Sequence, residues 1–228
     1  TFYNLDGDEI EKEPKEIKWD AQAAEKAGFE HFMMKEIHEQ PKAIKDTLGS
    51  VVKDGKIDLS NVGLAKEDIE NISQIHIVAC GSAWHVGMVA QYVIEDLARI
   101  PVRVELASEF RYRNPIIDKD ALVIIISQSG ETADSLAALR EAKSRGIKTL
   151  GIVNVVGSSI AREADNVFYT LAGPEISVAT TKAYSTQLIA SYILAIEFAM
   201  VRGQINQEQY DGFLSELSEL PDKIQKII

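Results

Sequence analysis

The sequence predicts an α/β fold, with a doubly wound, mostly parallel five-stranded sheet flanked by helices. The first observation behind this prediction is a series of apolar runs rich in β-branched residues, at 75–80, 102–108, 121–127, 148–154 and 166–171. The runs are nearly continuous rather than alternating, which is typical of parallel strands buried on both faces. The second observation is that helical patterns separate most of the runs, and repeated strand–helix units favour an open parallel sheet.

The helical patterns lie between and after the predicted strands. Residues 84–98 and 132–145 fill connections between strands, and Gly146 stands where a C-capping glycine belongs. A long apolar helix is expected over about residues 180–202, and an amphipathic helix from about 207 to 227. The long helix suits either the core of the domain or a contact with a second copy of the chain, and the sequence leaves both open.

The N-terminal part has a different character. Residues 1–20 are polar and acidic, and Asp6-Gly7 predicts a turn that suits a hairpin. Residues 21–48 follow a helical pattern, which we expect Pro41 to interrupt because proline has no N–H to donate. Since the chain begins with Thr1 rather than Met, we expect it to be a piece of a longer protein.

The composition excludes several classes of protein. The 228 residues are 46% hydrophobic and 26% charged, and they carry a net charge of −11. We therefore expect no nucleic-acid partner, because such binding draws most of its affinity from a basic face. We find neither an apolar run of about 18 residues that would cross a bilayer nor a secretory signal peptide, so no membrane association is expected.

Cysteine and histidine usage narrows the possible sites further. Cys80 is the single cysteine, so no internal disulfide can form, which fits a reducing cytoplasm. It ends an apolar strand, where a buried structural thiol is favoured over a reactive one. His31 and His38 have no cysteine or carboxylate cluster at metal-ligand spacing, so neither a metal nor another cofactor is expected.

The ligand site is expected where the strands end. In open α/β sheets, ligands bind beyond the carboxyl ends of the strands, near the point where the strand order reverses. Small and hydroxyl residues recur at that edge, in the stretches 80–83, 107–109, 127–132 and 154–159. This recurrence is stronger evidence for a ligand site at that edge than any single turn would be.

The stretch SQSGET, residues 127–132, is the strongest candidate within that edge. Gly130 permits a tight turn and Thr132 opens a helix, whose first N–H groups carry partial positive charge and can donate to phosphate oxygens. The hydroxyls of Ser127, Ser129 and Thr132 add donors without adding charge. The alternative is that Ser129 or Thr132 merely caps the helix, and spacing alone does not decide between the two.

A second candidate is the loop GPEISVATTKAYSTQ, residues 173–187. Such a loop can close over a ligand through backbone contacts from Val178 and Ala179. Glu175 could orient a sugar hydroxyl, although a lone carboxylate in a loop is weak evidence. Lys182 is the only nearby base, and a packing role is as well supported as a ligand contact.

Several motifs together resemble a known family. ACGSAWHVGMVA, ASEFRYRNP, ISQSGETADSLAALR and ISVATTKAYSTQL are similar to the sugar isomerase (SIS) fold. With KEIHEQP they resemble, more narrowly, the first isomerase subdomain of the glutamine–fructose-6-phosphate aminotransferases, the glucosamine-6-phosphate synthases. The resemblance covers roughly residues 20–205.

The resemblance implies a ligand and a set of contacts. Members of that family make glucosamine 6-phosphate from fructose 6-phosphate and glutamine, so a hexose phosphate is the expected ligand. The residues that match the phosphate contacts are Ser82, Ser127, Gln128, Ser129 and Thr132. The residues expected near the sugar are Cys80, Gly81, Glu175, Val178 and Ala179. Ala83 departs from the family pattern, which often has a second hydroxyl there.

The resemblance also implies a division of the chain. We expect residues 1–20 to be the tail of a glutaminase domain and residues 21–70 a helical entry segment. Residues 71–205 would form the sugar-phosphate-binding domain, and residues 206–228 a helix leading to a second SIS subdomain. The family's catalytic glutamate, lysine and histidine lie in that second subdomain, so we expect no catalytic residue in this chain and no complete reaction by it.

Other functions remain open at this point. One alternative is a regulatory SIS module that senses a sugar phosphate, which would require an adjoining helix-turn-helix and a basic face. Another is a single-domain sugar-phosphate isomerase, which would require its own general base. The candidates for that role are Glu109, Glu175 and His85. We expect a cytoplasmic protein that forms a homodimer, because SIS sites usually form between two such domains.

Overall fold

The computed structural model describes residues 2–11 and 25–228. Its centre is a parallel sheet of five strands in the order β6-β5-β7-β8-β9. The strands are β5 (Ile75–Ala79), β6 (Val102–Leu106), β7 (Leu122–Ser127), β8 (Lys148–Val153) and β9 (Asn166–Tyr169). The predicted α/β fold class is confirmed, and each predicted strand is present, ending within two residues of its expected bounds.

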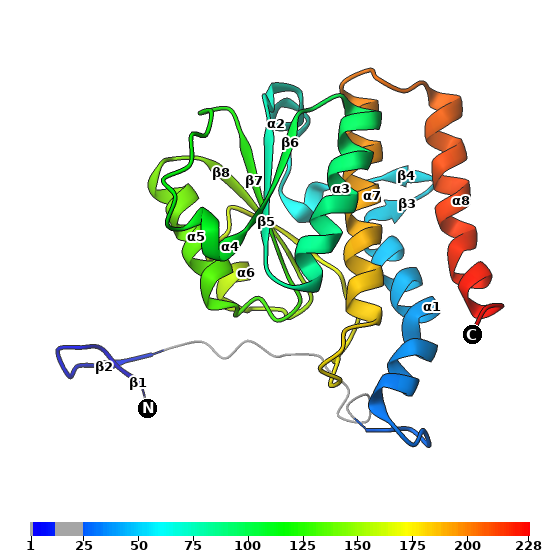
Figure 1. Cartoon of the computed structure of the whole chain (residues 1–228), viewed down its shortest axis with the longest axis horizontal. Coiled ribbons are helices and arrows are strands. Elements are labelled where there is room, and N and C mark those ends of the chain that lie inside the picture. The colour runs from blue at the N-terminus through cyan, green and yellow to red at the C-terminus, as the bar shows by residue number, and fades with distance from the viewer. Residues whose placement is uncertain (1, 12–24) are drawn as a thin grey trace.

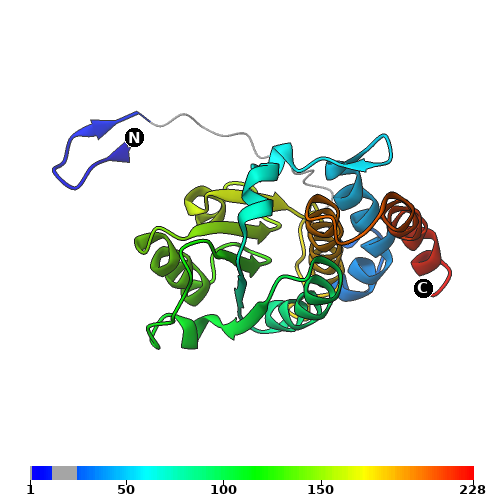
Figure 2. The same ribbon diagram turned by 90° about the horizontal axis from the view of Figure 1, so that it is seen from above.

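Helices cover both faces of this sheet. The helices of the described residues are α1 (Phe32–Val51), α2 (Lys66–Asn71), α3 (Ser82–Ala98), α4 (Ala107–Phe110), α5 (Ala133–Ser144), α6 (Ser159–Glu163), α7 (Lys182–Val201) and α8 (Gln207–Gln225). Figure 1 shows α4, α5 and α6 on one side of the sheet and α3 and α7 on the other. In the view from above, α1 and α8 lie outside α7 and form a further layer (Figure 2).

The strand β7 shows why its apolar run is unbroken. Leu122, Ile124 and Ile126 join the apolar cluster formed with α3 and α7, while Val123 and Ile125 join the cluster formed with α5. All five side chains are at most 2% exposed. Because successive residues of a strand point to opposite faces, a strand covered on both sides needs an apolar residue at every position.

Helix α7 is the central helix of the second layer. It packs against α1, α3 and α8, and it is buried on most of its circumference. Its length and mean hydropathy of 1.3 would suffice to span a bilayer, contrary to the expectation that no segment does, but 61% of that window is buried inside the protein. Most of its apolar surface therefore serves the core, one of the two uses that the sequence left open.

The predicted interruption of the first helix at Pro41 is wrong. Helix α1 runs unbroken from Phe32 to Val51 with Pro41 inside it. Proline cannot donate to the carbonyl of Ile37 four residues earlier, but the side-chain amide of Gln40 donates to that oxygen at 3.0 Å. Within the predicted helix, the described residues 25–31 are not helical, and the expected start at residue 21 lies outside the described residues.

The N-terminal hairpin that Asp6-Gly7 predicts is present within residues 2–11. Strand β1 (Phe2–Tyr3) pairs antiparallel with β2 (Glu9–Ile10). The side chain of Asn4 accepts the N–H groups of Asp6 and Asp8, at 3.0 and 2.8 Å, and Gly7 has a φ of +89°. A second small hairpin, β3 (Val52–Lys53) with β4 (Lys56–Ile57), follows α1, and the 3-10 turn η2 spans Ser60–Val62.

The half-buried carboxylate of Glu197 on α7 gives a test of the packing between α7 and α8. Burial raises its pKa above the ordinary 4.5, although the Tyr210 hydroxyl donates to it at 3.2 Å. A carboxyl whose pKa is raised by folding stabilises the fold at low pH, and this contribution is lost as the pH rises through the raised pKa. Glu197→Gln, which stays neutral, is therefore expected to melt at a higher temperature than the wild type at pH 8.

The two proteins should converge in melting temperature near pH 4, where both side chains are uncharged. Thermal unfolding followed by circular dichroism at both pH values measures the difference. An equal or lower melting temperature of Glu197→Gln at pH 8 would contradict the assignment of burial as the dominant effect.

Candidate functional site

A pocket opens where the strand order reverses. The second strand in sequence, β6, lies on one side of β5, whereas β7 and all later strands lie on the other, so the reversal falls between β5 and β7. The pocket has a volume of about 230 Å³. It is lined by Cys80, Ser82, Ala83, Ile126, Ser127, Gln128, Ser129, Thr132, Glu175, Ser177, Val178, Thr180 and Gln187.

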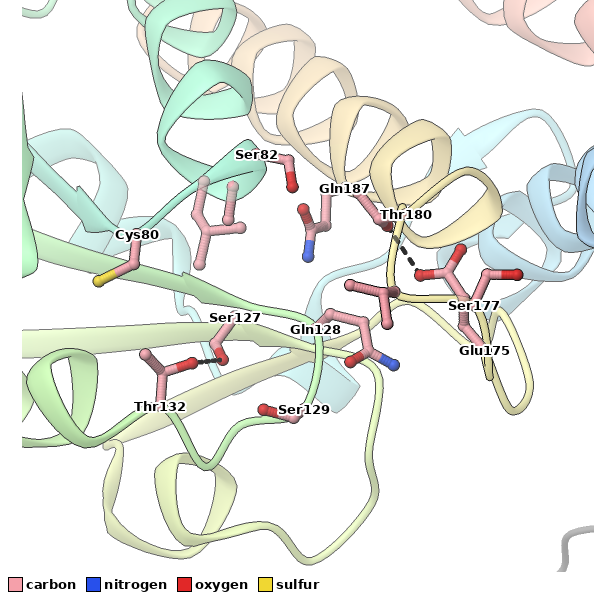
Figure 3. A pocket seen from close by; sticks show the side chains of 13 residues that line it. Cys80, Ser82, Ser127, Gln128, Ser129, Thr132, Glu175, Ser177, Thr180 and Gln187 are labelled. Atoms are coloured by element: carbon pink, nitrogen blue, oxygen red, sulfur yellow. Dashed lines mark hydrogen bonds between the residues drawn. The ribbon is translucent and has the colours of Figure 1, made fainter. Parts of the chain in front are cut away.

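The turn from Ser127 to Thr132 forms the floor of this pocket (Figure 3). Ser127 is buried at the end of β7, and its hydroxyl accepts the N–H of Gly130 at 3.1 Å and lies 3.2 Å from the Thr132 hydroxyl. Gly130 has a φ of +66°, and a Cβ there would lie 2.0 Å from the Ser158 hydroxyl oxygen. The turn therefore needs glycine for its backbone conformation and for its close contact with the next loop.

The capping alternative for Thr132 does not describe this turn. Thr132 is the N-cap residue of α5 by position, yet its side chain makes no capping hydrogen bond. Its hydroxyl contacts Ser127 instead, and the hydroxyl of Ser129 accepts the N–H of Glu131 at 3.2 Å. The first N–H groups of a helix have no partner within the helix, so those of α5 remain as donors at the pocket floor.

Glu131 anchors the turn from its outer side. Its carboxylate accepts the N–H of Ser159 at 2.7 Å, and this bond is the main reason its pKa lies below the usual range. The N–H of Ile160 donates to the carbonyl of Gly130 at 3.0 Å. The start of α6 thus holds the outer face of the turn, which leaves the inner face toward the pocket.

The start of α3 supplies the neighbouring wall. Gly81, the N-cap residue, has φ +59° and ψ −134°, a backbone conformation that only glycine adopts easily. Ser82 follows as the first residue of α3 with an exposed hydroxyl, and Ala83 contributes a methyl group to the lining. Two helix N-termini, those of α3 and α5, therefore meet at one pocket, and their partial positive charges favour an anion.

The pocket lining contains no lysine or arginine among the described residues. Among the described residues that line it, Glu175 is the one that carries a charge. Lys182, the nearest base in sequence, is only 2% exposed and donates to Glu39 of α1 at 2.6 Å. The packing role for Lys182, which the sequence left open, is therefore the one in the structure.

The loop 173–181, which we call the roof loop, covers the pocket opposite the turn. The Glu175 carboxylate accepts the hydroxyl of Thr180 at 2.7 Å and the N–H groups of Thr181 and Ala183 at 2.8 and 3.2 Å. Glu175 thus lines the pocket while it caps the start of α7, a structural use that the sequence did not suggest. Val178 also lines the pocket, and its side chain is fully exposed.

Asn154, which follows β8, joins the two halves of the pocket. Its backbone N–H donates to the carbonyl of Gln128, at 3.1 Å. Its buried side chain donates to the carbonyl of Gly173 at 2.7 Å and accepts the N–H of Ala172 at 2.8 Å. One residue therefore fixes the entrance of the roof loop relative to the turn.

Of the ten residues expected at the site, the pocket lining includes all but Gly81 and Ala179. Cys80 is half-buried and belongs to the pocket lining, whereas the sequence favoured a buried structural thiol. Its sulfur accepts a long contact of 3.9 Å from the Ser135 hydroxyl. The described residues contain no group of three or more histidine, cysteine or carboxylate side chains that could hold a metal.

Ser177, Thr180 and Gln187 also line the pocket; sequence reasoning included them in the candidate stretch 173–187 but assigned none of them a ligand contact. Gln187 is 3% exposed on α7, and none of the hydrogen bonds among the described residues uses its side-chain amide, which points into the pocket (Figure 3). The signal was present, because a glutamine on the most apolar helix of the chain needs a polar neighbour or a ligand.

The fold and the pocket together define an α/β domain with an anion-favouring pocket at the point where the strand order of its sheet reverses. The family model of the SIS domain matches residues 68–197, and the chain belongs to this family. Over all 228 of its residues the chain is 58% identical to a glutamine–fructose-6-phosphate aminotransferase [isomerizing] of Clostridium tetani. It is 49% identical, over 229 aligned residues, to the protein of that name in Methanosarcina mazei.

These relatives are longer than the chain, which spans 38% of the Clostridium tetani protein and 37% of the Methanosarcina mazei protein. A solved structure, the C-terminal domain of glucosamine-fructose-6-phosphate aminotransferase from Francisella tularensis, is 42% identical with a TM-score of 0.83. That match covers 87% of this chain and 56% of the other. Glucosamine-6-phosphate deaminase of Thermotoga maritima shares the fold at 22% identity, with a TM-score of 0.65 over 84% of this chain and 54% of the other.

The contact between Gly130 and Ser158 predicts a specific pattern of stability. Gly130→Ala places an alanine in a left-handed backbone conformation and brings its Cβ into a clash with Ser158. We therefore expect the free energy of unfolding to fall by about 2 kcal/mol or more. A second change, Ser158→Gly, removes both clashing atoms, the hydroxyl oxygen at 2.0 Å and the Cβ at 2.6 Å. The double variant should recover part of the loss, as measured by urea unfolding.

The matched control is Gly130→Ala with Ser158→Ala, which keeps the Cβ and should recover little. The Ser158 hydroxyl has no hydrogen-bond partner among the described residues, so its removal alone should cost little. Equal stability of Gly130→Ala and the wild type would show that the turn does not need glycine.

Proposed function

We propose that this chain binds fructose 6-phosphate, with the phosphate on the turn Ser127–Thr132. The observation that supports this most directly is the meeting of two helix N-termini and several hydroxyl groups at a pocket whose described lining has no basic side chain. Neutral donors of this kind suit a phosphate ester, whose oxygens accept several directed hydrogen bonds. The whole-length similarity to glutamine–fructose-6-phosphate aminotransferases supports the choice of sugar.

The proposal assigns the contacts as follows. The phosphate oxygens would accept bonds from the hydroxyls of Ser82, Ser127, Ser129 and Thr132, from Gln128 and from the N–H groups that open α5. The sugar would extend toward the roof loop and contact Cys80, Gly81, Glu175, Val178 and Ala179. Since Glu175 already accepts three bonds within the roof loop, it would receive a sugar hydroxyl only as an additional donor.

We propose further that the chain serves an enzyme that makes glucosamine 6-phosphate from fructose 6-phosphate and glutamine. In this proposal the chain supplies substrate binding, and we assign it no catalytic residue, metal or cofactor. Association into a homodimer and a cytoplasmic location belong to the same proposal. They are supported by the exposed apolar residues Ile176 and Val178 at the pocket rim and by the single, unpaired Cys80.

Removal of the floor hydroxyls tests the phosphate assignment. The double variant Ser127→Ala, Thr132→Ala should bind fructose 6-phosphate at least about 100-fold more weakly than the wild type, because each hydrogen bond to a charged group contributes about 1.5 kcal/mol. Isothermal titration calorimetry of both proteins gives the two dissociation constants.

The matched control is Ser144→Ala, Ser215→Ala, which removes two exposed helix hydroxyls outside the pocket lining and should bind like the wild type. Unchanged affinity in the pocket variant, with its melting temperature preserved, would refute the phosphate assignment. Failure of the wild type to bind fructose 6-phosphate would refute the proposed function of the chain.

A further inference from the structure

The carboxylate of Glu36 reaches from α1 to the roof loop across 140 residues of sequence. Glu36 is 1% exposed. Its Oε1 accepts the N–H of Ile176 at 2.6 Å and that of Ser177 at 3.2 Å, and its Oε2 lies 3.3 Å from the Ser177 N–H. Glu36 itself does not line the pocket.

A buried carboxylate in this position has a clear physical purpose. Removal of an ionised group from water is costly unless hydrogen bonds replace its hydration. Here the replacement comes from consecutive backbone N–H groups, which would otherwise be left in a loop that has no regular partner for them. These hydrogen bonds therefore replace the hydration of the carboxylate and give the backbone N–H groups of the loop their acceptor. The loop conformation and the position of Glu36 depend on each other for that reason.

The two N–H groups that Glu36 holds belong to the part of the roof loop that meets the ligand site. Ser177 lines the pocket, and Val178 follows it in the lining. The side chains of Ile176 and Val178 are 48% and 106% exposed, so side-chain packing does little to fix residues 176–178, the tip of the roof loop. Glu175 holds only the later half of the loop, at Thr180 and Thr181.

Further polar bonds fix α1 against the start of α7. Glu39 accepts Lys182 at 2.6 Å and Lys35 at 3.4 Å. The hydroxyl of Ser185 donates to Gln40 at 2.6 Å. Because these contacts occupy the same turn of α1 as Glu36, they set the height and rotation at which its carboxylate meets the roof loop.

We propose that Glu36 is a positioning residue of the pocket: its carboxylate holds the roof loop at Ile176 and Ser177 in the conformation that contacts the sugar part of the ligand. This inference rests on the proposed function for the identity of the ligand. Glu36 lies outside the pocket, on the helix that precedes the sheet in sequence. The inference makes it one of the residues that determine sugar affinity. The phosphate floor, which is formed by the turn 127–132, does not depend on it.

The test is Glu36→Gln, which keeps the size of the side chain but replaces one acceptor oxygen by an NH₂ group that faces N–H donors. Hydrogen–deuterium exchange of the 228-residue chain without ligand should show faster exchange in the roof loop, while exchange in α5 stays unchanged. Calorimetry should show fructose 6-phosphate bound about 10-fold more weakly. The affinity for inorganic phosphate, which needs only the floor, should change less than 2-fold.

The matched control is Glu197→Gln, which removes a half-buried carboxylate from the same helical layer but lies outside the pocket lining. It should leave roof-loop exchange and both affinities as in the wild type. A purely structural effect of Glu36→Gln would instead lower the melting temperature and weaken phosphate and fructose 6-phosphate binding to the same extent, and that result would overturn the inference.

The outcomes separate this inference from the proposed function. Wild-type protein that binds neither ligand would refute the proposed function, and the exchange experiment would still decide whether Glu36 holds the roof loop. Wild-type protein that binds fructose 6-phosphate, with Glu36→Gln equal to it in exchange and affinity, would overturn the inference alone.

Discussion

The parallel pairing of β5 with β7 is the interaction on which the site depends. Its register places Ala79 opposite Ile126, so Cys80, the first residue after β5, follows at the level of Ser127, the last residue of β7. The chain then turns into α3 after one strand and into α5 after the other, which directs two helix N-termini at the same space. A register shift of one residue would also turn the alternate side chains of β7 to the wrong face, so the packing of the core protects the geometry of the site.

The rest of the pocket is held by polar contacts rather than by the sheet. Asn154 ties the entrance of the roof loop to the turn, Glu175 ties its end to α7, and Glu36 ties its tip to α1. Each uses a side chain to satisfy backbone groups that no ladder or helix serves. The roof is therefore built from directed bonds to three separate elements, whereas the floor is set by the sheet itself.

This division explains what the sequence could predict. Local signals were enough for the strands, for the turn at Gly130 and for the hydroxyls around it, because apolar runs and glycine act over a few residues. They were not enough for Pro41, where the Gln40 amide replaces the missing donor, or for Gln187, which points into a space formed by distant segments. Glu36 is the clearest case, since its partners are 140 and 141 residues away.

The absence of a basic side chain from the described pocket lining has a consequence for how an anion would be held in a chain of net charge −11. Long-range attraction cannot assist its arrival, because the overall field is repulsive. What remains is short-range and directional: hydroxyls, N–H groups and helix ends, whose effect falls off within about one helical turn. Such donors distinguish a phosphate by its shape and its acceptors more than by its charge. Their alignment must therefore be fixed in advance, which is the role that Gly130, Glu131 and Ser127 fill in the floor.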